Sequence, residues 1–483
     1  MAEPLTRRRF VQRSGIAALA TVGLYGLLDT VATAPARAAV AGRALPPEQH
    51  LMRGLGVISD NGVQVVVPPL HHQIVTARLT AGSSRAQLLT ARQALEDALR
   101  AIERELPPTP SGLGLSVGWG LSYFRRLIPQ LADGRRFPDY LPRDRHASQA
   151  ANRHVPALLE AVRFASDPPE TVLERNDVVF VLQSDSQQHI AEAATTLFGK
   201  LDSLVQLTSI RKGFVGGGYT GKRSLPKAMA MSAGIPGAEF IPETAQLFLG
   251  FTSTQRAALG PDRIANFETL PGLTDQWPNG YFRNGTTLTL SHLYEDIEKW
   301  YTTQPFGRRL WLAHDLDRGI PDADTQTLPM DARHVQAIDD LKRLAVDGSD
   351  GGVGHSGAIQ TVNRLPADLR DNYGVLRPQG TAILQRADFN TLDNPFYWTS
   401  QPGLAADEPP AAAGLHFAAY SPTSDLFHRM RHAMDGRLGD GSELPIDARS
   451  ERMGMNSVLR TTHRQNFLVP PRRHRAFPLA ELL

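Results

Sequence analysis

The order of apolar patterns between residues 63 and 210 constrains the fold of this chain more than any other feature of the sequence. Short β-branched runs alternate with longer segments of helical spacing in the order strand, helix, strand, strand, helix, strand. This order is typical of a ferredoxin-like unit, in which both helices cover one face of an antiparallel sheet. We therefore predict an α+β fold whose first unit lies within residues 39–215.

Local patterns define the elements of this first unit. Ser83 and Ser84 stand where a helix N-cap belongs, and the apolar residues that follow share one helical face as far as the stop at Pro107 and Pro108. The strongest strand pattern is DVVFVLQ at residues 177–183, and a helix over 187–201 follows it. The other predicted strands cover residues 63–67, 73–79, 113–119 and 205–210.

A looser copy of this order follows in residues 216–440, which we predict to be a second ferredoxin-like domain packed sheet to sheet on the first. Its predicted strands cover 247–252, 286–290, 380–384 and 415–420, and its predicted helices cover 334–344 and 425–434. Residues 255–330 are rich in turn residues and are expected to be an insertion. Residues 441–483, rich in Arg and Pro, are expected to form a C-terminal tail.

The first 38 residues are expected to lie outside the fold, as a twin-arginine signal peptide. The motif TRRRFV at residues 6–11 is followed by an apolar run over 15–28 and by a cleavage site at Ala36-Arg37-Ala38. The run is too short and too rich in Ala and Gly for a membrane span. We therefore expect a protein exported by the twin-arginine pathway to the extracellular space, cell envelope or periplasm, without a stable membrane span.

Composition excludes several classes of function. The chain has no cysteine, which excludes disulfides, zinc-thiolate sites, iron-sulfur clusters and thiol catalysis. Loss of residues 1–38 would remove five arginines and two acids from the 51 basic and 49 acidic residues, leaving a net charge of −1. A near-neutral protein offers no electrostatic reason to bind nucleic acid.

The strongest chemical pattern lies in VGHSGAIQTVNRLPADLRDNYG, residues 353–374. It contains His355 and, fifteen positions later, the compact triplet Arg370-Asp371-Asn372. A neutral imidazole can ligate haem iron, and a cation and an amide on the opposite face can bind and polarise a peroxide. Taken alone, these residues favour a structural role, because a histidine can cap a turn and an RDN triplet is common on loops.

This stretch resembles the second half of a dye-decolourising (DyP-type) peroxidase, in which a proximal histidine precedes an R-D-N segment. Residues 177–201 and 414–436, with LFLGF and NFLVPP, resemble other segments of that family in the same order. The resemblance implies two ferredoxin-like domains of the dimeric α/β-barrel type, with antiparallel sheets packed around a haem pocket. It also implies haem b (iron protoporphyrin IX) with His355 as iron ligand, and Arg370 and Asn372 as catalytic residues facing the oxidant.

The chain departs from the family at its G-F-x-D-G signature, whose aspartate moves a proton between the peroxide oxygens. The matching residues are Gly213, Phe214, Val215, Gly216 and Gly217, so glycine replaces the acid. By the resemblance, Phe214, Gly216, Gly217 and Arg370 would lie against the haem. Loss of one general acid–base group typically lowers a rate by about a hundred to ten thousand fold.

The expected function is an exported peroxidase that oxidises bulky or phenolic donors with hydrogen peroxide. Its expected partners are hydrogen peroxide and an unidentified reducing substrate, and a homo-oligomer is left open. The missing acid keeps two alternatives open. One is a haem protein of the same fold that handles haem or iron or performs other haem chemistry, and the other is a haem-free secreted binding protein.

Two further patterns are weaker. Residues 216–222 have the spacing of a phosphate-binding P-loop, but Arg223 stands where a Ser or Thr should bind magnesium. His428 and His432 have the i, i+4 spacing of a helical metal site. Exposed cations near a helix C-terminus are the commoner explanation of the histidine pair.

Overall fold

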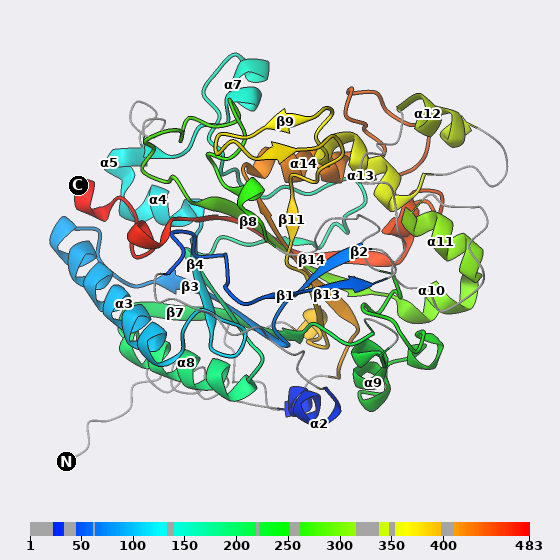
Figure 1. Cartoon of the computed structure of the whole chain (residues 1–483), viewed down its shortest axis with the longest axis horizontal. Helices are drawn as coiled ribbons and strands as arrows, with labels where there is room; N and C mark the ends of the chain where they lie inside the picture. Colours follow the sequence, from blue (N-terminus) through cyan, green and yellow to red (C-terminus); the bar gives the residue numbers. More distant parts are fainter. Residues whose placement is uncertain are drawn as a thin grey trace.

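Eight strands pair into one closed ring that organises the molecule (Figure 1). The computed structural model describes residues 23–32, 45–60, 63–132, 140–218, 222–251, 261–314, 338–346, 353–397 and 410–483. Hydrogen-bonded neighbours follow one another around the ring and return to the first strand, and every pair is antiparallel. The order is β3 (His71–Leu79), β6 (Val178–Ser184), β4 (Gly114–Trp119), β14 (Leu459–Val469), β8 (Thr286–Glu295), β13 (Gly414–Ser421), β12 (Phe389–Thr391) and β7 (Val205–Phe214).

Short strands attach to the ring or form hairpins outside it. β5 (Val172–Leu173) pairs with β14, and β11 (Gln385–Arg386) pairs with β13. The hairpins are β1 (Gly56–Asp60) with β2 (Val63–Val67) and β9 (Leu369–Arg370) with β10 (Leu376–Arg377). The α-helices are α2 (Leu28–Val31), α3 (Arg85–Glu105), α4 (Leu121–Leu127), α5 (Pro129–Ala132), α7 (Arg145–Ala151), α8 (Gln187–Lys200), α9 (Leu225–Ser232), α10 (Ile297–Thr303), α11 (Phe306–His314), α12 (Ile338–Val346), α13 (His355–Asn363) and α14 (Ser424–Met434).

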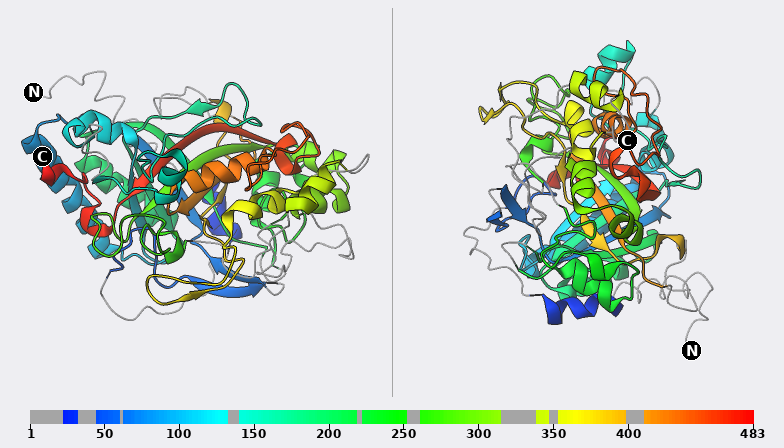
Figure 2. Two further views of the ribbon diagram at one scale, coloured as in Figure 1. Left: turned by 90° about the horizontal axis from the view of Figure 1, so that it is seen from above. Right: turned by 90° about the vertical axis from the view of Figure 1, so that its right-hand side faces the viewer.

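Side chains alternate between the interior and the exterior of the ring, as the pleat of a strand requires. Part of the interior is an apolar cluster that includes Ile74, Val179, Leu290 and Phe467, and His292 and His416 are buried on the same faces of β8 and β13. Two pairs of neighbouring helices, α3 with α8 and α13 with α14, cover the exterior at opposite ends of the molecule (Figure 1). Figure 2 shows the same separation from above. One helix pair therefore covers strands from the first half of the chain, and the other covers strands from the second half.

The first half forms as predicted, because its local signals agree with its packing. The Ser84 side chain caps α3 by accepting a hydrogen bond from Gln87 N–H, and the buried residues Leu88, Leu95 and Leu99 share one face of the helix. β6 is buried on both faces, which explains its continuous apolar run. The strands and helices predicted between residues 63 and 210 are confirmed, although β7 continues four residues further, to Phe214.

Two predicted strands of the second half are wrong. Residues 247–251 form turns, with residue 252 outside the described part of the chain. Trp300 Nε1 and Tyr301 Oη donate hydrogen bonds of 2.9 and 2.7 Å to the carbonyls of Leu249 and Phe248, so side chains satisfy this apolar backbone. Residues 380–384 precede the short strand β11 instead of forming a strand themselves.

Two peripheral segments of the prediction lie in the centre of the fold. The predicted insertion 255–330 contains β8, which pairs with both β13 and β14. The predicted tail 441–483 contains β14, and its end returns to the first half, where Phe477 packs against Trp119 and Tyr123. The C-terminus accordingly lies beside α3 in two views (Figures 1 and 2).

Residues 23–32 pack into the protein, which differs from the expectation that residues 1–38 lie outside the fold. Leu28 is fully buried, and the buried Tyr25 hydroxyl donates to the Lys212 carbonyl and to Asp393 Oδ1 at 3.0 and 2.9 Å. Asp29 lies 2.8 Å from His71. In the described part of the chain, no helix combines the length and the apolar character that a membrane crossing requires.

Candidate functional site

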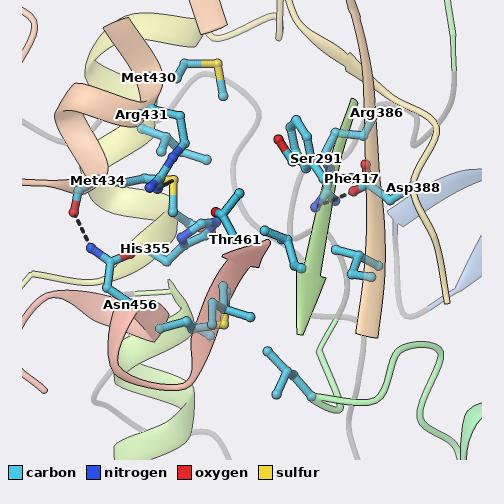
Figure 3. A pocket seen from close by; sticks show the side chains of 18 of the residues that line it. Ser291, His355, Arg386, Asp388, Phe417, Met430, Arg431, Met434, Asn456 and Thr461 are labelled. Carbon is cyan, nitrogen blue, oxygen red and sulfur yellow. Dashed lines mark hydrogen bonds and ion pairs between the residues drawn. The ribbon is translucent and has the colours of Figure 1, made fainter. Parts of the chain in front are cut away.

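A large cavity opens between the helices α11, α13 and α14 and the exterior faces of β8, β13 and β14 (Figure 3). About 1550 Å³ of empty space lies between its walls, including the mouth. In Figure 3, His355, Met434 and Asn456 lie on one side of this space, and Arg386 and Asp388 lie on the other. The cavity therefore has one wall that carries the His355 imidazole and an opposite wall that carries the Arg386 guanidinium and the Asp388 carboxylate.

Helix α13 supplies much of the wall that carries His355, which we call the histidine wall. Its cavity-lining residues recur at the spacing of one helical face: His355, Ser356, Ile359, Gln360, Asn363 and Arg364. Gly354 is the N-cap, so His355 is the first residue of the helix. Gly454 passes so close that a Cβ there would lie 2.8 Å from the His355 backbone nitrogen, and its φ of +57° also favours glycine. The start of α13 is thus fixed by a close backbone contact.

The His355 imidazole is uncharged at neutral pH. Burial, together with the positive charges of Arg386 and Arg431, lowers its pKa from 6.5 to about 3. Among the described residues, no hydrogen bond reaches its ring nitrogens. A neutral imidazole with a free nitrogen is the form of histidine that ligates metals.

A second imidazole, His314 at the end of α11, lines the same cavity. Its Nδ1 lies 3.3 Å from Ser356 Oγ, and burial lowers its pKa to about 3. Its Nε2 is buried without a hydrogen-bond partner among the described residues. The histidine wall therefore carries two neutral imidazoles.

Arg386, Asp388 and Glu295 place ionisable side chains in the opposite part of the cavity. Arg386 Nη1 lies 3.6 Å from Asp388 Oδ2, and Ala418 N–H donates a 3.1 Å hydrogen bond to Asp388 Oδ1. Burial raises the pKa of Asp388 to about 6, although Arg386 acts in the other direction. Burial, helped by the charge of Asp388, raises the pKa of Glu295 to about 8.

A buried ionic cluster closes another part of the wall. Asp167 lies between Arg464, which binds both carboxylate oxygens, and Arg431, whose Nη2 is 3.3 Å away. Burial would raise the pKa of Asp167, but the hydrogen bonds and charges of these arginines leave it lowered. Because each charge has a partner, this cluster is a rigid support rather than a proton carrier.

Several polar atoms of the cavity wall are buried without a hydrogen-bond partner. Among the described residues these include both side-chain heteroatoms of Gln360, Asn363 Oδ1 and Glu295 Oε2. An unpartnered buried polar group costs about 1–3 kcal/mol, so proteins rarely leave several of them in one place. Their presence indicates that the cavity accommodates a polar ligand or water.

The structure brings only one of the sequence-predicted site residues to this cavity, namely His355. Arg370 is exposed on the β9–β10 hairpin, where its Nη1 donates a 2.6 Å hydrogen bond to the Gly374 carbonyl. Asn372 Nδ2 donates to the Glu268 carbonyl at 2.6 Å. Both side chains thus donate hydrogen bonds to loop carbonyls, and neither is among the described residues that line the cavity.

The residues of the signature region also lie outside the described wall. Phe214 is fully buried in an apolar cluster with Phe248. A Cβ on Gly216 would meet Leu225 and Leu70 at 3.9 and 4.0 Å, and Gly217 also faces Leu225. A side chain at position 216 would therefore enter an apolar layer.

The structure tests only one of the two weaker patterns. Residues 219–221 of the P-loop spacing lie outside the described part of the chain. His428 packs against Phe164, and burial lowers its pKa to about 4, so it is neither exposed nor a cation. The described residues contain no group of three or more ligand side chains that could hold a metal.

Sequence reasoning missed Arg386, Asp388, Glu295 and His314. The first pair had a usable signal: in ILQRAD, arginine and aspartate are two residues apart after an apolar run, the spacing that places both on one face of an extended segment. Glu295 had a weaker one, as the acid that ends the pattern of β8. For His314 we find no such signal.

Comparisons with known proteins give one family match and several solved structures of low sequence identity. Residues 69–471 match the model of a family of unknown function, DUF7405. No curated protein matches. Among solved structures, a protein of Shewanella oneidensis described as DyP-type is 15% identical, with 84% of this chain and 93% of that chain covered and a TM-score of 0.47. DyPB of Rhodococcus jostii (15% identity, 84% and 94% covered, TM-score 0.46) and the encapsulated DyP-type peroxidase of Mycobacterium smegmatis (15%, 84% and 93%, 0.46) are similar too.

Proposed function

Because the chain belongs to the DUF7405 family, whose function is unknown, we propose its function from its own cavity: a haem-dependent peroxidase that uses hydrogen peroxide. The observation that carries this proposal is His355, a neutral imidazole at the wall of a large cavity, with no hydrogen-bond partner among the described residues and with Arg386 across the space. Solved structures of similar fold include a Rhodococcus jostii DypB variant in complex with haem.

The residues present fit haem b. His355 would hold the iron, because its imidazole stays neutral and no described residue occupies its nitrogens. The unpartnered polar atoms of Gln360 and Asn363 would gain partners from bound water or from a polar edge of the ligand. When bound, the haem would supply the redox chemistry that the side chains lack.

Arg386, rather than Arg370, is the arginine that the geometry favours for the oxidant. Its guanidinium lies on the wall opposite His355. There it would hold a peroxide by hydrogen bonds and stabilise the negative charge that develops on the departing oxygen. Arg370 and Asn372, engaged on loops, would bind neither haem nor oxidant.

Export and domain duplication complete the proposal. The twin-arginine motif at residues 6–11 supports export. Conversion of Arg7 and Arg8 to lysine should then retain the protein in the cytoplasm. Two ferredoxin-like halves are supported by the ring, to which each half of the chain contributes four strands, with one helix pair over each half.

The proposal is tested by absorption spectroscopy of the protein supplied with haem. We expect a Soret band that is lost in His355→Ala and kept in His146→Ala, a matched change at an exposed histidine of α7. Peroxide should change the spectrum, and a phenolic donor should restore it. A folded protein without any Soret band would refute haem binding, and a His355-dependent band that does not respond to peroxide would favour haem handling over peroxidase chemistry.

A second pair of variants separates the two candidate arginines. Arg386→Ala should slow the reaction with peroxide by about a hundred fold or more, the usual effect of losing one charge-stabilising donor. Arg370→Ala should leave the rate unchanged. The opposite result would return the catalytic role to the arginine that the sequence pattern indicated.

A further inference from the structure

We propose that Asp388 is the acid–base residue of the cavity, in place of the acid that is absent at Gly216. This inference rests on the peroxidase function proposed above and adds the group that moves the proton. Three observations carry it: the position of Asp388 in the wall, the contacts that fix its carboxylate, and its access to a second space.

Asp388 and Arg386 lie side by side in the wall opposite His355 (Figure 3). A peroxide held by the Arg386 guanidinium would therefore lie within reach of the neighbouring carboxylate. Position 216 is not among the described residues that line the cavity, and a Cβ there would lie 3.9 and 4.0 Å from Leu225 and Leu70, in an apolar layer. The acid–base group of this chain thus comes from the segment between β11 and β12.

The contacts of Asp388 fix one oxygen and leave the other for chemistry. Oδ1 accepts the hydrogen bond from Ala418 N–H, so the carboxylate cannot rotate freely. Oδ2 faces Arg386 at 3.6 Å, which is longer than a hydrogen bond. A general base needs this combination of a fixed position and an oxygen that can accept a proton.

Asp388 also stands between two spaces. With Arg386 and Leu247 it lines both the large cavity and a smaller pocket bounded by Val66, Pro68 and other residues near the β1–β2 hairpin. Its carboxylate is therefore bordered by open space on two sides, whereas arginine occupies both oxygens of Asp167.

The groups that act on Asp388 suit proton exchange near neutral pH. Burial raises its pKa to about 6 against the effect of Arg386, while Glu295 on β8, with a pKa of about 8, stays protonated at pH 7. Two carboxyl groups of one cavity with separated pKa values are typical of acid–base pairs. Asp388 would be the ionised base, and Glu295 a neutral hydrogen-bond donor.

The proton balance of the step is simple. Breakage of the O–O bond of hydrogen peroxide needs two electrons, which bound haem would supply. For the departing oxygen to leave as water, the proton on the oxygen that stays must move to the oxygen that departs. Asp388 would take this proton from the oxygen that stays and give it to the oxygen that departs, so the carboxylate is unchanged at the end.

The test compares Asp388→Asn with Glu295→Gln in the haem-loaded protein. Asp388→Asn should slow the reaction with peroxide by about a hundred to ten thousand fold, since it removes one acid–base group. Glu295→Gln should slow it less than tenfold, and Asp388→Glu should restore part of the rate. An unchanged rate in an Asp388→Asn protein that binds haem normally would overturn this inference and leave the proposed function intact.

A second readout does not depend on turnover. Hydrogen cyanide must lose its proton to bind haem iron as cyanide, so Asp388→Asn should also slow cyanide binding, followed as the shift of the Soret band. If Asp388 has only a structural role, the rate of cyanide binding will be unchanged in the folded variant. That result would overturn the proposal. Absence of a Soret band in the wild-type protein would instead refute the haem function on which the proposal rests.

Discussion

The two helix pairs cover the same ring of strands, but they meet different surfaces. Under α3 and α8 the strands present apolar residues, among them Val75, Phe180 and Leu182. Under α13 and α14, β8 presents Ser291 and Glu295 to the cavity. The same arrangement of layers thus produces a filled core at one end and, at the other, a hollow space whose largely apolar wall also carries polar and ionisable groups.

This difference indicates that one end stabilises the fold and that the other end provides the space of the candidate site. The first end gains stability from continuous apolar burial, which contributes about 25 cal/mol per Å². Among the described residues, the second end keeps buried polar atoms without hydrogen-bond partners, including those of Gln360 and Glu295, and each such atom costs about 1–3 kcal/mol in an empty protein. Such a cost is expected where a site is prepared for a ligand.

The largest expected effect is on packing at the filled end. Phe198→Ala on α8 removes a fully buried ring that contacts Phe180, and we expect the free energy of unfolding to fall by about 3–5 kcal/mol. Ile359→Ala, on the α13 face that lines the cavity, should cost less than about 2 kcal/mol because fewer contacts are lost. Denaturant titration measures the free energy of unfolding of both variants. Equal losses would contradict the difference in packing between the filled and the hollow end.

The next effect concerns residues 23–32, which pack beside the hollow end. A chain that begins at residue 39 should lose about 2–4 kcal/mol, because burial of Leu28 and the hydrogen bonds of Tyr25 are lost. Tyr25→Phe in the full chain should cost about 1 kcal/mol. If both chains unfold at the same denaturant concentration, the segment contributes nothing, and cleavage after Ala38 would leave the fold unaltered.

A smaller effect comes from pH. The pKa of His314 is lowered to about 3, below the unfolded value of 6.5, so its stability contribution is present above pH 6.5 and is lost as pH falls. Between pH 7 and pH 5 this group should cost about 2 kcal/mol. The free energy of unfolding of His314→Gln should therefore change less over this interval than that of the wild type, and parallel curves would exclude the effect.

The smallest effect reverses the usual sign. Gln360→Leu replaces two unpartnered polar atoms by apolar ones, so we expect stability to stay equal or rise by up to about 1 kcal/mol. The matched control is Gln49→Leu, because Gln49 is buried with hydrogen bonds to Val117 and Pro470. It should lose about 1–3 kcal/mol. A comparable loss in Gln360→Leu would show that the hollow end is packed like the filled one.

The first half was predictable because its signals are local. The cap at Ser84, the helical face of α3 and the apolar run of β6 each lie within one element and agree with its tertiary packing. The strand predicted at 247–252 failed because Trp300 and Tyr301 supply its hydrogen bonds. A contact of that kind, some fifty residues away, leaves no trace in a local pattern.

The site was predictable only in part, for the same reason. His355 was recognised, but its helix was not, since Ser356 and Gly357 are weak helix formers and the start of α13 depends on the contact with Gly454. Arg370 and Arg386 both stand beside a polar partner in the sequence. The path of the chain decides which of them meets the cavity, and spacing alone does not record that path.

The ring has a mechanical consequence that follows from how it closes. The halves meet at two seams of one residue pair each, Asn390 with Phe214 and Leu468 with Trp119, whereas the ladders within each half are long. We expect the strand pairs at these two seams to separate before the longer ladders within either half do. Asp388 stands two residues from one seam, so movement there would alter the reactive wall while the packed half keeps its shape.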